Sequence, residues 1–127
     1  MSTLQPRAVI VTRETDYERL LAAHATRQQA GFFLRMRGQG IDDVADRHEA
    51  FQSVLGRVRA LIPDNWRIAR VKRTDLDRFS FSPADVVVAV GQDGLVANLA
   101  KYVDGQPVLG VNPDPTTIEG VLTPLAV

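Results

Sequence analysis

The chain has 127 residues and no cysteine, and its 15 basic and 15 acidic side chains cancel to no net charge. Such a length corresponds to about one domain, and 45% hydrophobic with 24% charged residues is ordinary for a globular protein. The balanced charge provides no field that would attract nucleic acid or an acidic membrane, so neither is an expected partner. The missing cysteines exclude a disulfide framework, a thiolate nucleophile and a cysteine-ligated metal. With no signal-like or membrane-length apolar run, we expect a cytoplasmic protein.

The first third of the sequence predicts one strand and two helices. Ala8–Val11 is a compact run rich in β-branched residues, which favours a strand. A helix is expected to begin near Thr15 or Asp16, and Thr26 is a suitable cap for a second helix. The second helix carries three large apolar residues that we expect to form its buried stripe: Phe32, Phe33 and Met36.

From Ile41 to Ile62, apolar residues recur at alternating steps of three and four, the strongest periodic pattern in the chain. The pattern predicts a long amphipathic helix that begins with the acidic pair Asp42 and Asp43 and ends at Pro63. A helix lying on a sheet is the usual meaning of such a pattern. A short coiled-coil seam, and with it a homo-oligomer, stays open as an alternative. The two histidines, His24 and His48, lie on the apolar faces of their helices, where we expect packed side chains.

The second half of the chain predicts three more strands. Trp66–Val71 alternates like a peripheral strand, and the basic residues around it are interleaved with acids, which favours a solvated edge over a basic patch. Asp85–Val90 is a continuous apolar run, typical of a strand buried on both faces in the middle of a parallel sheet. A helical segment and a last strand, Val108–Val111, follow. This alternation predicts an α/β fold of the doubly wound, Rossmann-like type with a mostly parallel sheet.

The candidate site lies where predicted strands end, because the carboxyl ends of parallel strands meet at one edge of the sheet. Three segments reach that edge: Thr12 with Arg13, Gly91 to Leu95, and Gly110 to Asn112. Gly91 and Gly94 lack a β-carbon, so we expect their amides to approach a phosphate closely.

Asp93 stands between the two glycines and would repel a bare phosphate, so it suits a hydroxyl or a bound Mg²⁺. The alternative is a plain strand-to-helix turn in which the glycines serve geometry and Asp93 caps the helix. The loop is neither a dinucleotide fingerprint nor a P-loop, and no group of His, Asp and Glu has metal-ligand spacing.

Two stretches, Asp85 to Leu95 and Pro107 to Asn112, resemble the N-terminal lobe of the ATP- or polyphosphate-dependent NAD kinase family. That family, grouped with diacylglycerol and sphingosine kinases, has a strand, a Gly-Gly-Asp-Gly-Thr loop and a helix. A strand ending Gly-(Ile/Val)-Asn and a Gly-Phe-Leu-Thr segment follow, and Gly120 to Thr123 of this chain resembles the latter. Before Pro83 the resemblance rests only on the order of the elements.

The resemblance implies a site. Asp93 would be the general base or the carboxylate that assists a metal, acting on the hydroxyl that is phosphorylated. The family's loop backbone and threonine hold donor phosphates; here Gln92 replaces the second glycine and Leu95 replaces the threonine. The ligand is then a nucleotide or dinucleotide, with Mg²⁺ and either ATP or polyphosphate. The implied phosphate- or nucleotide-binding set is Gly91, Gln92, Gly94, Leu95 and Asn112, to which the edge adds Thr12 and Arg13.

The resemblance also implies a domain organisation. Residues 1–127 would be a single α/β domain, the N-terminal lobe of a longer two-domain protein cut near residue 127. NAD kinases bind the dinucleotide mainly on a second, β-rich lobe with an Asn-Asp or Asn-Glu motif that this chain does not contain. We therefore expect the isolated chain to be inactive. Two alternatives remain: a non-catalytic nucleotide-binding or regulatory module on the same fold, and an oligomerisation domain that uses the helix from Ile41 to Ile62.

Overall fold

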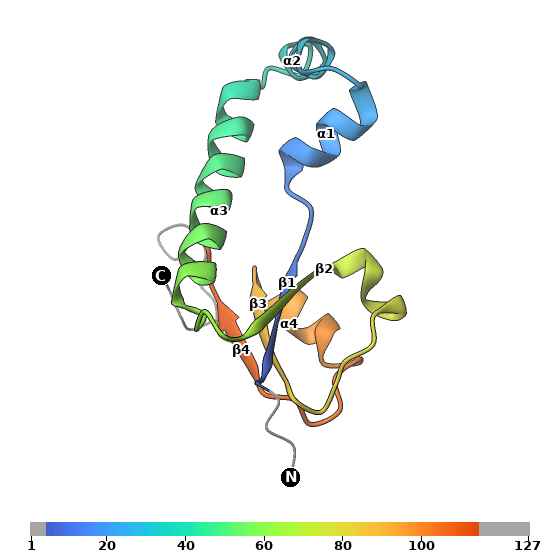
Figure 1. The fold of residues 1–127 in the computed structure, drawn as a ribbon. Helices are drawn as coiled ribbons and strands as arrows, with labels where there is room; N and C mark the ends of the chain where they lie inside the picture. Colours follow the sequence, from blue (N-terminus) through green and yellow to red (C-terminus); the bar gives the residue numbers. More distant parts are fainter. Residues whose placement is uncertain (1–4, 115–127) are drawn as a thin grey trace. The chain divides into compact units, whose positions relative to one another are not determined.

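The computed structural model describes residues 5–114, and its centre is a four-stranded parallel sheet in the order β2-β1-β3-β4 (Figure 1). The strands are β1 (Arg7–Thr12), β2 (Arg67–Lys72), β3 (Asp85–Val90) and β4 (Val108–Val111). The helices are α1 (Asp16–His24), α2 (Arg27–Arg35), α3 (Ile41–Leu61) and α4 (Asp93–Leu99), with a 3-10 helix η1 (Arg73–Arg78). All the predicted strands and helices form within a few residues of the expected bounds, with β3 in the interior of the sheet and β2 at its edge.

The chain divides into two compact units. One comprises the residues up to Arg13 together with those from Arg57 onward, and it contains the sheet, η1 and α4. The other, Glu14–Gly56, contains α1, α2 and most of α3. Within residues 5–114, none of the helices has the length and apolar character needed to span a bilayer.

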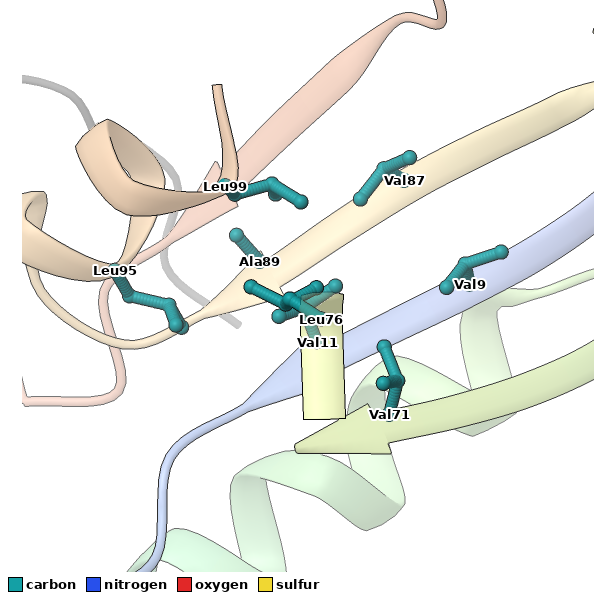
Figure 2. Packing of buried hydrophobic residues seen from close by; sticks show 8 residues of the cluster. All are labelled: Val9, Val11, Val71, Leu76, Val87, Ala89, Leu95 and Leu99. Carbon is teal, nitrogen blue, oxygen red and sulfur yellow. The ribbon is translucent and has the colours of Figure 1, made fainter. Parts of the chain in front are cut away.

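The core of the sheet unit lies on one face of the strands, under η1 and α4 (Figure 2). Its eight buried members alternate along the strands and then continue into the two helices: Val9, Val11, Val71, Leu76, Val87, Ala89, Leu95 and Leu99. The residues between them on β1 and β3, such as Ile10 and Val90, are also buried. A parallel sheet buried on both faces is what continuous apolar strands require. The predicted Rossmann-like α/β fold is therefore confirmed.

In the helical unit, both predicted helix starts are confirmed. Thr15 caps α1 through a capping box with Glu18, and the hydroxyl of Thr26 accepts a hydrogen bond from the amide of Gln29 at 3.1 Å. His48 is packed as expected, with its Nδ1 2.8 Å from the Thr15 hydroxyl. This contact ties the start of α1 to α3.

The predicted buried stripe of α2 is wrong. Phe32 is 59% exposed and Met36 is 72% exposed. The buried face instead consists of Ala30, Gly31 and Leu34. A β-carbon added at Gly31 would lie 3.5 Å from Cγ2 of Ile41, an ordinary packing distance, so the packing of this face does not depend on glycine.

Candidate functional site

The sheet brings the three predicted segments to one edge within a single unit of the chain. Val90 of β3 pairs in register with Val111 of β4, and Val11 of β1 pairs with Ala89 of β3. Because all pairings are parallel, the residues that follow these strands emerge on the same side. Thr12, Gly91 and Asn112 therefore lie at the carboxyl edge of three adjacent strands, as the sequence predicts.

Gly91 serves the packing of the loop. Its amide donates a hydrogen bond to the carbonyl of Val111 at 3.0 Å, which extends the pairing of β3 with β4. A β-carbon on Gly91 would lie 2.8 Å from Cδ2 of Leu95, closer than real contacts allow. The expectation that the Gly91 amide meets a phosphate is thus wrong, because the sheet already uses that amide.

Asp93 is the first residue of α4, and the residue before it, Gln92, is the N-cap. Gln92 is exposed and has ordinary extended backbone angles, and its side chain makes no capping hydrogen bond. Asp93 is therefore the first helical residue and not the N-cap residue. A half-buried carboxylate in the first turn of a helix interacts favourably with the helix dipole.

Gly94 has no steric reason to be glycine, since nothing lies within 4 Å of where its β-carbon would be. Its φ lies outside the left-handed region, so the backbone does not require glycine either. A glycine in a helix costs roughly 0.5–1 kcal/mol relative to alanine. What this glycine provides is a bare, exposed stretch of backbone beside Asp93, open to a close approach by a ligand.

Leu95 does not belong to the open part of the site. Its side chain is 4% exposed and lies in the core cluster, where Figure 2 shows it reaching toward the sheet. Its amide donates to the carbonyl of Gln92 at 3.0 Å, closing the first turn of α4. The predicted ligand contact by Leu95 is therefore contradicted for its side chain, which packs under the loop.

The remaining candidates differ in accessibility. Thr12 is 1% exposed, whereas its neighbour Arg13 is exposed. Asn112 is 5% exposed, and its side-chain oxygen accepts the amide of Asp114 at 2.9 Å, which shapes the turn after β4. Among the predicted site residues, Arg13 thus supplies a cationic side chain that is exposed to solvent at this edge.

Sequence reasoning missed the end of β2. Lys72 pairs in register with Thr12, so a second cation lies at the same edge of the sheet. Unlike Arg13, Lys72 is half-buried. With the amide of Asn98 on α4 turned so that its oxygen faces the next residue, Arg73, that guanidinium donates two hydrogen bonds to it, at 2.9 and 3.1 Å. The signal in the sequence was the group of basic residues around Trp66–Val71, which we interpreted as a solvated edge of the sheet and not as part of the site.

The opposite, amino edge of the sheet holds a buried ion pair that the sequence did not reveal. Arg7 contacts the fully buried carboxylate of Asp85 through two hydrogen bonds, of 2.8 and 2.7 Å, and the amide of Ser82 donates to the same carboxylate at 2.7 Å. Burial by itself raises the pKa of Asp85, but these hydrogen bonds and the charge of Arg7 outweigh it and lower that pKa below its ordinary value. The hydrogen bond to Asp85 also raises the pKa of Arg7. The ion pair lies at the edge opposite the carboxyl ends of the strands, away from the candidate site, which indicates a structural role.

A glycine-flanked carboxylate between the central strand of a parallel sheet and a helix is typical of α/β proteins that bind ligands beyond the carboxyl ends of their strands. No known family model matches the chain. The chain is 30% identical over 123 residues to "NAD kinase 2, mitochondrial" of Rattus norvegicus, a match covering 91% of this chain and 29% of the relative. The Homo sapiens protein of that name is also 30% identical, with 28% of its length covered, and the Xenopus tropicalis protein is 28% identical.

This similarity supports an NAD kinase-like relationship for the chain. The chain spans under a third of the length of these relatives.

Proposed function

We propose that this chain is the nucleotide-phosphate lobe of an NAD kinase-like phosphotransferase. The reaction is transfer of a phosphoryl group from ATP or polyphosphate to a hydroxyl of NAD or a related acceptor. One observation carries the proposal: Asp93 begins α4 directly after the central strand β3, on the edge that Thr12 and Asn112 share. The similarity over 91% of the chain to proteins named NAD kinase 2 supports it.

The residues of this chain would divide the work as follows. Asp93 accepts a hydrogen bond from the acceptor hydroxyl, orients it and takes its proton as the new P–O bond forms and the P–O bond to the rest of the donor breaks, so that ADP or the shortened polyphosphate leaves. The bare backbone at Gly94 lets the donor phosphates come close, and the exposed guanidinium of Arg13 lowers the repulsion between their charge and Asp93. Gln92 places an exposed amide side chain where the family has glycine, so it contacts the donor or the acceptor directly.

The site is compatible with a Mg²⁺ ion that is held partly by the protein and partly by the phosphates of the substrate. Among residues 5–114, no group of three or more His, Asp or Glu side chains could hold a metal by itself. Mg²⁺ is usually bound by one or two carboxylates together with substrate phosphates and waters, and Asp93 can supply one such carboxylate. When bound, the ion would neutralise charge on the donor phosphates.

The acceptor half of the site belongs, in this proposal, to a second lobe. The supporting observation is the coverage: the aligned region spans 27–29% of each relative. Residues 1–127 are then the N-terminal α/β lobe of a longer protein and are inactive alone.

Two assays of NADP formation test the proposal, one on the full-length protein and one on the purified 127-residue chain, each with NAD, Mg²⁺ and either ATP or polyphosphate. We expect turnover by the full-length protein with at least one donor and none by the isolated chain. No turnover with either donor would refute the phosphotransferase function. Turnover by the isolated chain would refute the division of the site between two lobes.

The burial of Leu95 favours a second candidate, a non-catalytic nucleotide-binding or regulatory module. Because that side chain lies in the core and carries no hydroxyl, the loop lacks one of the family's phosphate contacts. Such a module would bind ATP in a calorimetric titration of the full-length protein without forming NADP. Oligomerisation through α3 stays a prediction, and it fails if a folded Phe51→Glu variant sediments with the same mass as the unsubstituted chain.

A further inference from the structure

The helical unit contains an open hollow that the proposed phosphotransferase function does not use. It lies at the α1–α2 corner, within Glu14–Gly56, and has a volume of about 690 Å³. Small-molecule sites usually measure roughly 300–1,000 Å³, so the hollow has the right size for one. Its main apolar lining residues are Ala23, Phe32, Phe33 and Met36; His24 and the cationic Arg37 also line it.

The apolar part of the lining is unusually exposed. Phe32 on α2 is 59% exposed and Met36, at the C-cap of the same helix, is 72% exposed, while the helix buries Ala30, Gly31 and Leu34. Large apolar side chains that are exposed side by side leave apolar surface that the body of a ligand can cover. Phe32 and Met36 therefore provide a surface against which an apolar group can pack.

Arg37 supplies the polar part of the recognition. Its guanidinium lies over the ring of Phe33, 3.9 Å from the ring centroid, and the ring of His24 packs against the same phenyl group at 4.4 Å. This contact with the ring uses none of the N–H groups of the guanidinium, so they stay available for the fork-like binding of an oxyanion.

The lining of the hollow, as far as the structure describes it, carries positive charge from Arg37 without a neighbouring acidic side chain. No carboxylate lines it, and within the part of the chain that the structure describes Arg37 forms no salt bridge. Two of the other exposed arginines of this unit have acidic partners, in the pairs Arg19–Asp16 and Arg27–Asp42. An anion is therefore the complementary occupant.

We propose that this hollow binds a small amphipathic carboxylate, a molecule with an aliphatic or aromatic body and one carboxylate head. The body covers Phe32 and Met36, and the head takes two hydrogen bonds from the edge of the Arg37 guanidinium. The site is separate from the carboxyl-edge loop and stands or falls independently of the phosphotransferase function.

The test is a titration of the ¹⁵N-labelled 127-residue chain with decanoate, with decanol as the neutral control and acetate as the control without an apolar body. We expect decanoate to shift the amide signals of Ala23–Arg37 and to bind about tenfold more tightly than decanol, as loss of a charge-assisted hydrogen bond would imply. Arg37→Gln should weaken decanoate binding about tenfold and leave decanol binding unchanged. Arg35→Gln is the matched control, an exposed arginine of α2 outside the lining, and should change neither.

Equal binding of decanoate and decanol, or an unchanged decanoate affinity in Arg37→Gln, would overturn the carboxylate proposal. The comparison between the two ligands needs only the unsubstituted chain, so it holds even if a variant misfolds. A second copy of the chain is the other possible occupant, and sedimentation equilibrium tests for it. If the mass doubles as the concentration rises, and no longer does so in Met36→Asn, the hollow binds a second copy and the small-ligand proposal is refuted.

Discussion

Replacing Asp85 by asparagine tests how the amino edge of the sheet is held together. The carboxylate is fully buried and accepts three hydrogen bonds, two from Arg7 at 2.8 and 2.7 Å and one from the amide of Ser82 at 2.7 Å. The Asp85→Asn side chain would keep the shape of the carboxylate and one acceptor for the Ser82 amide. It would leave the guanidinium of Arg7 without its counter-charge.

The magnitude follows from the burial of the two partners. Removing one partner of a fully buried ion pair costs roughly 3–5 kcal/mol. The side chain of Arg7 is 22% exposed, so water relieves part of the penalty, and we expect Asp85→Asn to lower the free energy of unfolding by about 2–3 kcal/mol at neutral pH. The double variant Arg7→Met/Asp85→Asn should lose less than the sum of the two single variants, because neither charge is then left alone.

The pH dependence has a definite sign. The pKa of Asp85 is lowered in the folded state, so the unfolded chain binds its proton more readily. The stabilisation is therefore complete above the unfolded Asp pKa of about 3.9 and is lost as the pH falls through the lower folded value. The stability gap between the unsubstituted chain and Asp85→Asn should narrow accordingly in acid.

Urea unfolding followed by far-UV circular dichroism, repeated from neutral pH downward, measures both effects. Asp104→Asn, at an exposed acid in the turn after α4, is the matched control and should leave stability within about 0.5 kcal/mol. An Asp85→Asn variant as stable as the unsubstituted chain, or a gap that widens in acid, would refute the reasoning.

The remaining predictions concern single contacts. Gly91→Ala should lower the free energy of unfolding by about 1–3 kcal/mol, because its methyl group would stand 2.8 Å from Leu95 in the core. Gly94→Ala should be neutral or stabilising by up to about 1 kcal/mol, yet cut turnover of the full-length protein about tenfold by blocking the phosphate approach; equal effects of the two substitutions on stability would contradict this. Thr15→Ala should cost about 1–2 kcal/mol by urea unfolding, because it removes both a helix cap and the contact with His48, whereas Thr15→Ser should restore most of it. A Thr15→Ser variant as unstable as Thr15→Ala would show that the hydroxyl is not the cause.

The sequence was sufficient where a structure depends on neighbouring residues. The buried strand Asp85–Val90 follows from an unbroken apolar run, and the starts of α1 and α2 follow from the hydroxyls of Thr15 and Thr26. The placement of Gly91 and Asn112 at one edge then follows from parallel topology alone.

It was insufficient where distant residues meet. Arg7 and Asp85 are 78 positions apart, and only the register of β1 with β3 brings them opposite each other. The face that α2 buries, Ala30, Gly31 and Leu34, depends on contacts with other elements that the apolar pattern of the helix does not specify. The same holds for Gly91, whose missing side chain makes room for Leu95 and not for a ligand.

The rate of NADP formation by the full-length protein with Asp93→Asn tests the central claim most directly. If Asp93 takes the proton of the acceptor hydroxyl, kcat should fall about 100-fold or more with little change in the KM of the phosphoryl donor. Asp104→Asn in the same protein should keep its kcat. Unchanged turnover in Asp93→Asn would contradict the account.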